Sequence, residues 1–376
     1  MKNKKINIGF FISDDGYGHA ARQSSIISYL LKNNKKKKFQ IHVYGNKIIK
    51  KIKNEFKNKI KYQKFDNIIQ TKKNFDGSLS LSRTKKIFSF WKKNKKVLIK
   101  KVKSKVKKFD LLISDSVPHV FDAANELNIK ALNISHFTWD WFYLKTFKRD
   151  MIYNELVKSY KKSDKFIFPP LTDPEILKIY KNKVHKVNFI VTDSFVRKRF
   201  PIFKRKKISQ CIIMDNGSRV LSTKILKIIK HLKEFNDLNF IISANSFDKN
   251  QIQNIKKIKN CKIEKDLKSI HKYIPQCDFL IARGGFNTIT ECLILKKPTI
   301  LYNETKNIEV KKNISFLVEK GLSYPINREF FTNSFKKKID YFRNYKLNKI
   351  NKIFLRYKFK GNGSDQAGRI IISCLS

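Results

Sequence analysis

Short apolar runs alternate with longer stretches of helical periodicity along most of the chain. The first run, Lys5–Ile12, is followed by a polar, glycine-containing turn and then by apolar residues at helical spacing up to about Leu31. Further apolar runs of strand length follow in the first half, at Phe39–Tyr44, Phe109–Ser114, Lys130–Ile134 and Lys165–Phe168. Strands that alternate with helical segments are typical of a parallel sheet with crossover helices.

The same alternation begins again after a basic, proline-containing stretch at about residues 188–207. The strand candidates there are Gln210–Met214, Leu238–Ser243, Cys261–Glu264, Asp278–Ala282 and Pro298–Tyr302. We therefore predict the α/β class, with two Rossmann-like, doubly wound domains at residues 1–190 and 208–360 and a closing helix at residues 361–376. Ligands of such sheets bind at the carboxyl ends of the strands, so we expect the site in a cleft between the domains.

Composition favours a folded chain in a reducing compartment. The 376 residues are 41% hydrophobic and 13% aromatic, which is enough to form cores. No run reaches the roughly 20 apolar residues that a spanning helix needs. Asp14 and Asp15 follow the first apolar run too closely for a signal peptide. The five cysteines show no C-x-x-C spacing, so neither a disulfide scaffold nor a zinc ribbon is expected, and a cytoplasmic location fits.

The net charge of +53, from 83 basic and 30 acidic residues, predicts attraction to anions. Only 12 of the basic residues are arginine, the side chain that specific nucleic-acid recognition favours, so no specific nucleic acid is expected. The basic stretch Lys85–Lys108 carries apolar residues at largely helical spacing, among them Trp91. It is either a core-facing stripe with a solvated lysine face or a surface that docks on an anionic membrane.

Candidate chemistry first occurs where the first predicted strand ends. Gly16 and Gly18 allow a tight turn into the next helix, and His19 and Arg22 follow in its first turn. Histidine can accept a proton near neutral pH, so His19 is the candidate general base. The alternative is an ordinary tight turn with a solvated histidine.

An acidic residue, Asp115, follows the predicted strand Phe109–Ser114. An acid at the carboxyl end of a parallel strand lies where ligands bind, and it could orient a histidine by accepting its second ring proton. Asp115 is equally expected as the N-cap of the helix that begins near Pro118. One side chain can fill both roles.

The most specific string, Arg-Gly-Gly-Phe-Asn-Thr-Ile-Thr-Glu, begins at Arg283, after a predicted strand, and opens a helix. Backbone N–H groups after Gly284 and Gly285 can bind a diphosphate at the positive end of that helix. The Thr288 hydroxyl and the Arg283 cation would add to such a site. Glu291 lies one turn further on, where a carboxylate could accept both hydroxyls of a ribose. The alternative is an ordinary capped helix.

These residues carry a resemblance to a known family. The stretch from Arg283 to Gly321, which contains Lys297-Pro298 and Glu309, resembles the C-terminal nucleotide-sugar motif of family-28 glycosyltransferases. That group has the GT-B fold and includes the lipid-linked N-acetylglucosaminyl transferase of peptidoglycan synthesis. Gly16–Arg22 is similar to the Gly-x-Gly-His-x-x-Arg element of the same superfamily. Ile113–Tyr143 further resembles the glycosyltransferase-like region of plant arabinokinases.

The resemblance implies a hexosyltransferase that moves a sugar, with inversion, from a nucleotide-diphosphate donor to a hydroxyl acceptor. Its implied donor contacts are Gly284, Gly285, Thr288, Glu291 and Glu309, and Arg283 adds a cation nearby. Gly217 and Ser218 lie in the first turn of the second domain, where relatives have a more glycine-rich loop, and they can still supply N–H donors near the β-phosphate. Its implied acceptor-side residues are Gly16, Gly18, Arg22 and Trp139, beside the catalytic pair His19 and Asp115. Relatives have Gln where this chain has Val310, which leaves the sugar open.

The expected co-substrate is a UDP-linked sugar, and no further cofactor is expected. No Asp-x-Asp stands on a suitable loop, so a metal is not indicated. The expected acceptor is a glycan or a lipid-linked acceptor of the cell envelope, with peripheral contact at the inner face of the cytoplasmic membrane. Two other classes remain open: a nucleotide-sugar epimerase or hydrolase of the same fold, and a non-catalytic protein that binds sugar nucleotides or nucleic acid.

Overall fold

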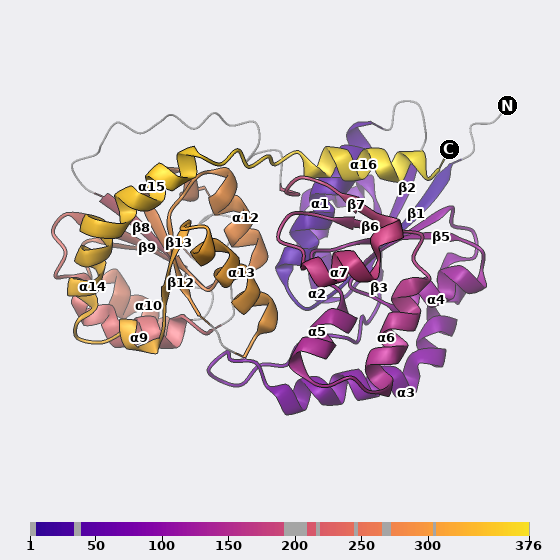
Figure 1. Ribbon diagram of the computed structural model, residues 1–376, viewed down its shortest axis with the longest axis horizontal. Coiled ribbons are helices and arrows are strands. Elements are labelled where there is room, and N and C mark those ends of the chain that lie inside the picture. The colour runs from indigo at the N-terminus through magenta and orange to yellow at the C-terminus, as the bar shows by residue number, and fades with distance from the viewer. Residues whose placement is uncertain are drawn as a thin grey trace. The chain divides into compact units, whose positions relative to one another are not determined.

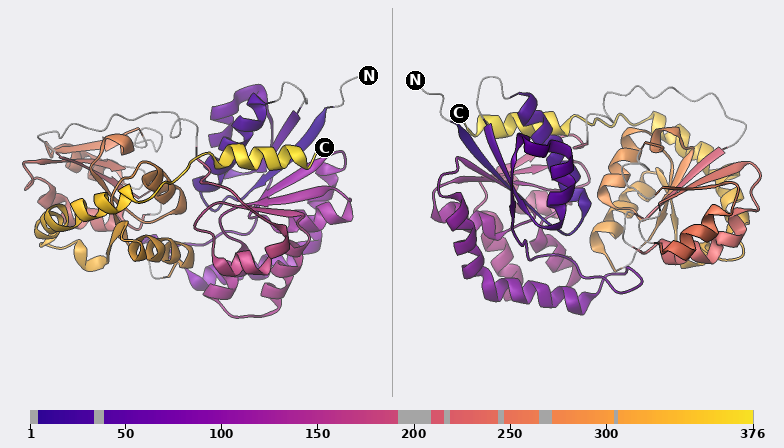
Figure 2. Two further views of the ribbon diagram at one scale, coloured as in Figure 1. Left: turned by 45° about the horizontal axis from the view of Figure 1, so that its top comes forward. Right: turned by 180° about the vertical axis from the view of Figure 1, so that it is seen from behind.

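The chain folds as two compact units, each built on one sheet. The computed structural model describes residues 5–33, 39–191, 209–215, 219–243, 247–264, 272–303 and 306–375. The first unit comprises Met1–Lys72, Ser80–Val196 and Lys360–Ser376, and the second comprises Lys73–Leu79 and Arg197–Phe359. In both units helices cover a parallel sheet (Figures 1 and 2).

The first unit holds a seven-stranded parallel sheet in the order β3-β2-β1-β4-β5-β6-β7. Its strands are β1 (Ile6–Ile12), β2 (Phe39–Gly45), β3 (Lys61–Lys64), β4 (Leu111–Asp115), β5 (Lys130–Ile134), β6 (Lys165–Phe168) and β7 (Val184–Lys186). All five residues of β4 are buried, as expected for a central parallel strand covered on both faces. The chain reverses its direction of travel across the sheet between β1 and β4, and such a switch point is where ligands bind in open α/β sheets.

The second unit repeats this plan with six parallel strands in the order β10-β9-β8-β11-β12-β13. They are β8 (Ser209–Met214), β9 (Leu238–Ser243), β10 (Cys261–Glu264), β11 (Phe279–Ala282), β12 (Thr299–Tyr302) and β13 (Ser323–Ile326). Here the switch point lies between β8 and β11, where Met214 is in register with Ala282. The residues that follow these two strands therefore share one edge of the sheet.

The segments between the strands, and the chain after β13, form the helices. Those of the first unit are α1 (Tyr17–Lys32), α2 (Lys47–Phe56), α3 (Leu81–Val106), α4 (His119–Glu126), α5 (Trp139–Thr146), α6 (Met151–Lys161), α7 (Pro174–Ile179) and α16 (Gly363–Ser373). Those of the second are α9 (Ser222–Leu232), α10 (Lys249–Lys256), α12 (Phe286–Ile294), α13 (Ile308–Glu319), α14 (Phe335–Tyr341) and α15 (Leu347–Leu355). No helix among the described residues is both long and apolar enough to cross a bilayer.

The C-terminal helix α16, yellow in Figure 1, belongs to the first unit and packs on α1. Gly368 makes this contact possible, because a Cβ atom there would lie 2.1 Å from Cδ1 of Tyr29. Ala367 and Ile371 of α16 join the same buried cluster as Ile26 of α1. The helix predicted at the end of the chain thus braces the helix that begins with the Gly-x-Gly-His motif.

The predicted α/β class with two parallel, doubly wound sheets is confirmed. Every strand predicted from an apolar run is present, most of them within one or two residues of the expected bounds. Three strands were missed: β3, β7 and β13. All three lie at the edges of their sheets and are short, and only one residue in β3, Tyr62, is apolar, so their pattern gives little signal.

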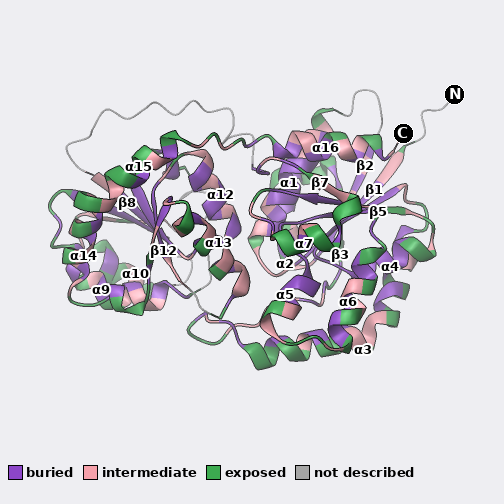
Figure 3. Cartoon of the chain, viewed as in Figure 1, coloured by how far each residue is buried: buried purple, intermediate pink, exposed green. Residues whose placement is uncertain are grey.

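The basic segment that the sequence left open forms the 26-residue helix α3. Its apolar stripe faces the core, with Phe88 and Trp91 fully buried, while much of the opposite face is exposed (Figure 3). Trp91 Nε1 donates a hydrogen bond to Nδ1 of His119, 3.3 Å away, at the start of α4. Burial lowers the pKa of His119 to about 4. The core-stripe interpretation is therefore right for Trp91. It does not decide whether the exposed lysine face of α3 contacts a membrane.

Candidate active site

The structure brings the two predicted catalytic residues together at the switch point of the first sheet. His19 lies in the first turn of α1, directly after β1, and Asp115 is the last residue of β4. Ile12 at the end of β1 is in register with Asp115, and the backbone N–H of Ser13 donates to the Asp115 carbonyl. This places His19 Nδ1 2.8 Å from Asp115 Oδ1, with both side chains buried.

Two further side chains of α1 hold the Asp115 carboxylate. Arg22 donates through Nε to Oδ2 at 3.1 Å and through Nη2 to both oxygens at 2.9 Å. Gln23 Nε2 donates to Oδ2 at 2.8 Å and to the carbonyl of Ile134 at 3.0 Å. Burial alone would raise the pKa of Asp115, but Arg22 and His19 together hold it below its usual range. Asp115 is therefore a carboxylate in spite of complete burial.

This arrangement fixes the tautomer of His19. The carboxylate of Asp115 can only accept, so the proton on His19 resides at Nδ1 and the lone pair at Nε2. Arg22 Nη2 lies 3.2 Å from the same Nδ1 atom and also donates to Oδ1, so the two donors share one acceptor. Within the described residues Nε2 makes no hydrogen bond, so it is the atom that can accept a proton from a substrate.

A second histidine, His136, belongs to the same cluster and was not predicted from the sequence. It follows β5, the neighbour of β4, and its ring centroid lies 6.3 Å from that of His19. Arg22 Nη1 lies 3.0 Å from His136 Nδ1, and because arginine only donates, this nitrogen accepts. In this arrangement Nε2 is the ring nitrogen of His136 that carries a proton. Its position after an adjacent strand was the available signal.

The acceptor-side predictions have mixed outcomes. Gly16 is the N-cap of α1 and Gly18 lies in its first turn, but a Cβ at Gly16 would meet no atom within 4 Å, so no close contact requires glycine there. Arg22 is buried beneath Asp115 rather than presented to a ligand. Trp139 has no exposed surface, and its indole N–H donates to the Ser116 carbonyl at 2.8 Å. Trp139 is therefore a core side chain in this structure, with no exposed ring face on which an acceptor sugar could stack.

In the second unit the Arg-Gly-Gly string forms the turn between β11 and α12. Gly284 has a φ of +90°, and a Cβ there would lie 2.8 Å from Ile314 Cγ1 of α13, so only glycine fits. Gly285 is the N-cap of α12 and has no side chain that could cap the helix. Arg283 is half-buried directly before this turn. The first turn of α12 therefore starts at the carboxyl edge of the sheet, as predicted for a phosphate site.

The other predicted donor residues of this unit lie on α12 and α13. Thr288 is buried, with its hydroxyl 3.7 Å from Met214 Sδ of β8, and Glu291 is half-buried one turn later. Glu309 is half-buried in the first turn of α13. Val310 beside it is buried, and its Cγ1 would lie 3.5 Å from a Cβ at Gly284. The Val310 side chain therefore packs against the Gly284 turn.

One supporting residue was not predicted: Asn313 of α13, whose Nδ2 lies 3.5 Å from the Gly284 carbonyl. Asp215, which follows β8 at the same edge, accepts from the backbone N–H groups of Leu221 and Ser222 at the start of α9. Gly217 and Ser218, the predicted contacts in that turn, lie outside the described residues.

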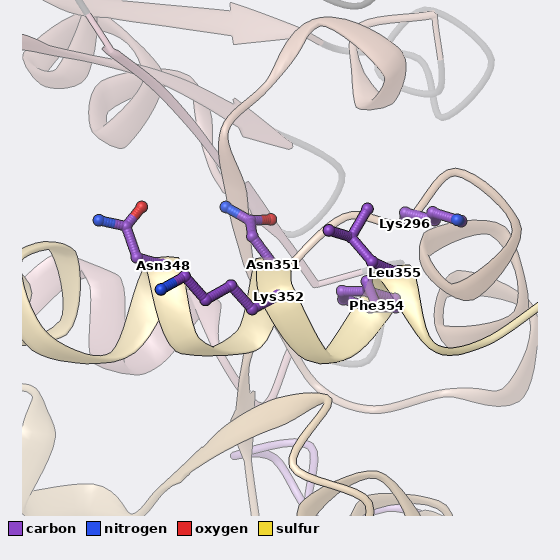
Figure 4. A pocket seen from close by; sticks show the side chains of 6 residues that line it. All are labelled: Lys296, Asn348, Asn351, Lys352, Phe354 and Leu355. Atoms are coloured by element: carbon purple, nitrogen blue, oxygen red, sulfur yellow. The ribbon is translucent and has the colours of Figure 1, made fainter.

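A hollow of about 450 Å³ on the second unit does not coincide with these residues (Figure 4). Its lining is Lys296, Asn348, Asn351, Lys352, Phe354 and Leu355. Lys296 precedes β12, so this hollow lies towards the amino ends of the strands, away from the edge that carries Gly284. In the part of the chain that the structure describes, no three side chains of His, Cys, Asp or Glu gather as metal ligands. Independence from metals remains a prediction.

Comparison with known proteins relates these features to a family. Residues 216–352 match the family model of the Glycosyltransferase family 28 C-terminal domain. A stretch of 118 residues is 31% identical to the UDP-N-acetylglucosamine--N-acetylmuramyl-(pentapeptide) pyrophosphoryl-undecaprenol N-acetylglucosamine transferase of Prochlorococcus marinus (strain MIT 9312). That match covers 30% of this chain and 31% of the relative, so the chain matches about a third of the relative's length.

Solved structures match over nearly the whole chain at low identity. MurG of Acinetobacter baumannii superimposes with a TM-score of 0.63 over 98% of this chain and 100% of that chain, at 14% identity. A UDP-N-acetylglucosamine 2-epimerase superimposes with a TM-score of 0.60 over 98% of this chain and 96% of that chain, at 12% identity. At such identities the likeness shows the fold alone, and both transferases and an epimerase share that fold.

Two parallel, doubly wound sheets of this kind define the chain as a protein of the GT-B fold. Residues 216–352 of its second unit match the glycosyltransferase family 28 C-terminal domain, and the Gly284 turn and α12 lie inside the matched residues. The resemblance drawn from the Arg-Gly-Gly string is thereby confirmed.

Proposed function

We propose that the protein is an inverting glycosyltransferase that moves a sugar from a UDP-linked donor to a hydroxyl acceptor in cell-envelope glycan or glycolipid synthesis. The observation that carries this proposal is the buried His19–Asp115 pair, with His19 Nε2 as a proton acceptor at the switch point of the first sheet. The family-28 domain supports a nucleotide-sugar donor in the second unit. A protein that only bound a sugar nucleotide would not need the oriented histidine.

The chemistry follows from the charges that move during transfer. The oxygen of the acceptor hydroxyl forms a bond to the anomeric carbon, and His19 Nε2 takes the proton of that hydroxyl. The bond from that carbon to the β-phosphate oxygen breaks, and the nucleoside diphosphate leaves with the electron pair. Backbone N–H groups at the start of α12 and the Arg283 cation would stabilise this negative charge. A single displacement inverts the configuration.

Donor binding can be tested without knowledge of the acceptor. A ligand that binds only the folded state stabilises it by about 2.7 kcal/mol at a concentration of 100 times its Kd, and so raises the melting temperature. We expect a UDP-sugar to raise the melting temperature of the full chain more than the sugar phosphate or uridine alone. Absence of a shift with every nucleotide sugar would contradict the proposal.

Glu291 is the proposed contact to the ribose hydroxyls. Removing a charged hydrogen bond acceptor should weaken donor binding by about 1–3 kcal/mol. We therefore expect Glu291→Ala to raise the donor Kd by about 5- to 150-fold in isothermal titration calorimetry. Glu319→Ala, on the exposed end of α13, removes the same charge from the same unit and should leave the Kd unchanged. Equal donor affinity in Glu291→Ala and the wild type would refute this assignment.

We also propose that α3 holds the protein against the anionic inner face of the cytoplasmic membrane, where a lipid-linked acceptor would reside. Phe90 and Val97 on its outer face are 53% and 51% exposed. Exposed lysines Lys86, Lys93 and Lys100 lie on the same face at helical spacing. Exposed apolar side chains among lysines are typical of a helix that lies in a membrane interface.

The membrane proposal predicts loss of binding from surface changes alone. Changing Lys86, Lys93 and Lys100 together to Gln should reduce cosedimentation with phosphatidylglycerol vesicles by about tenfold or more, since each lysine near such a surface contributes about 1 kcal/mol. The same change at Lys249, Lys256 and Lys257, exposed residues on and just after α10, is the control and should have little effect. Equal loss in both variants would indicate attraction by net charge alone.

A further inference from the structure

The turn after β4 has a backbone conformation that its residue type does not favour. Ser116, between Asp115 and Val117, is buried and has a φ of +62°. A residue with a Cβ is disfavoured in this left-handed region, and it stays there only when its surroundings hold it. Because Ser116 directly follows Asp115, any relaxation of its backbone would displace the carboxylate that orients His19.

The indole of Trp139 is one of the groups that bond to this turn. Its Nε1–H donates to the Ser116 carbonyl at 2.8 Å. Trp139 is itself fixed: its backbone N–H donates to the Tyr160 hydroxyl at 3.2 Å, and Phe88 of α3 packs edge-on against its ring at 5.6 Å. On the other side of the turn, Ser114 Oγ accepts from the Val117 N–H at 3.0 Å.

We propose that Trp139 is a positioning residue for catalysis: it holds Ser116 in the left-handed conformation and thereby keeps the Asp115 carboxylate against His19. This inference rests on the proposed function. It gives Trp139 a role through the backbone of its neighbour rather than through contact with a sugar. Arg22 and Gln23 of α1 also donate to the Asp115 carboxylate, and the turn holds the Asp115 backbone from which that carboxylate projects.

The role predicts a rescue that ordinary packing would not show. Trp139→Phe keeps an aromatic ring but removes the donor, so Ser116 can relax to a negative φ. We expect kcat to fall about tenfold, the effect of about one hydrogen bond, with the KM for the donor within about twofold. Adding Ser116→Gly removes the preference against the left-handed region, because glycine has no Cβ. The double variant Trp139→Phe/Ser116→Gly should regain most of the lost kcat.

The control is Phe142→Leu, a buried neighbour whose ring lies 5.2 Å from that of Trp139. It opens space in the same core without removing a donor, so Ser116→Gly should not improve its kcat. A second readout is independent of turnover: the downfield proton resonance of a histidine Nδ1–H bonded to a carboxylate. This resonance should be absent in His19→Gln, weakened in Trp139→Phe and restored in the double variant.

Loss of kcat in Trp139→Phe without rescue by Ser116→Gly, or with an unchanged resonance, would overturn the positioning role. Equal rescue of Phe142→Leu would also overturn it, since the glycine would then act through general packing. If the wild type transfers no sugar from any UDP-sugar to envelope lipid extract, that result contradicts the proposed function without contradicting the positioning role of Trp139. The resonance series would still decide whether Trp139 positions Asp115.

Discussion

Replacement of His19 by alanine is expected to lower turnover by about 10²–10⁴-fold, the usual contribution of a general base. The reason is geometric: His19 Nε2 is the one atom of the pair that can accept the acceptor's proton, because Nδ1 is engaged with Asp115 at 2.8 Å. Donor affinity should stay nearly constant, since the proposed donor contacts lie in the other unit. Steady-state transfer rates and donor titrations on the same preparation measure both quantities.

His185→Ala is the matched control for this experiment. His185 lies on the edge strand β7 of the same unit, away from the switch point, and its replacement should leave turnover within about twofold of the wild type. Asp115→Asn should lower turnover less than His19→Ala, because it removes orientation and charge but leaves the imidazole. Full turnover in His19→Ala with the true acceptor would refute the base assignment.

Replacement of Arg22 by methionine is expected to have the largest effect on stability. Arg22 and Asp115 are both buried and joined by three hydrogen bonds, and breaking such a pair from one side leaves the buried carboxylate without its guanidinium partner. The expected cost is about 3–5 kcal/mol of unfolding free energy. Denaturant titration followed by circular dichroism measures this loss, which should appear as a lower midpoint.

The double variant Arg22→Met/Asp115→Asn separates the charge from the packing. Asparagine carries no charge, so the double variant should be more stable than Arg22→Met alone, by about 2 kcal/mol or more. If Asp115→Asn restores no stability in the Arg22→Met background, the loss of unfolding free energy comes from packing of the arginine stem. The Arg22–Asp115 ion pair would then not be what stabilises this part of the first unit.

The parts of the fold that could be predicted are those where burial sets the residue pattern. Central strands such as β1 and β4 are covered on both faces, so their sequences are continuous apolar runs with a turn at each end. Edge strands are not fully covered: Lys61–Lys64 pairs with one neighbour only and is mostly exposed, so nothing in its composition marks a strand. The α3 segment showed its period clearly, but a period alone does not tell what the polar face meets.

Prediction of the site succeeded where the order of the strands determines which residues lie close together. His19 and Asp115 each follow a strand, and the two strands meet at the switch point, so the topology brings them together. Prediction failed where side-chain direction decides. Trp139 starts a helix near the site but points inward to Ser116, and His136 reaches Arg22 from a strand end that carried no motif. Spacing along the sequence contains no information on either direction.

Transfer itself is tested most directly by following the sugar of a UDP-sugar with and without envelope lipid extract. We expect release of UDP only when extract is present. A glycosylated lipid should form in the same molar amount, and the anomeric configuration of its sugar should be opposite to that in the donor. Release of UDP and free sugar without extract, or conversion of the donor to an isomeric UDP-sugar, would contradict the transferase account and favour a hydrolase or an epimerase on the same fold.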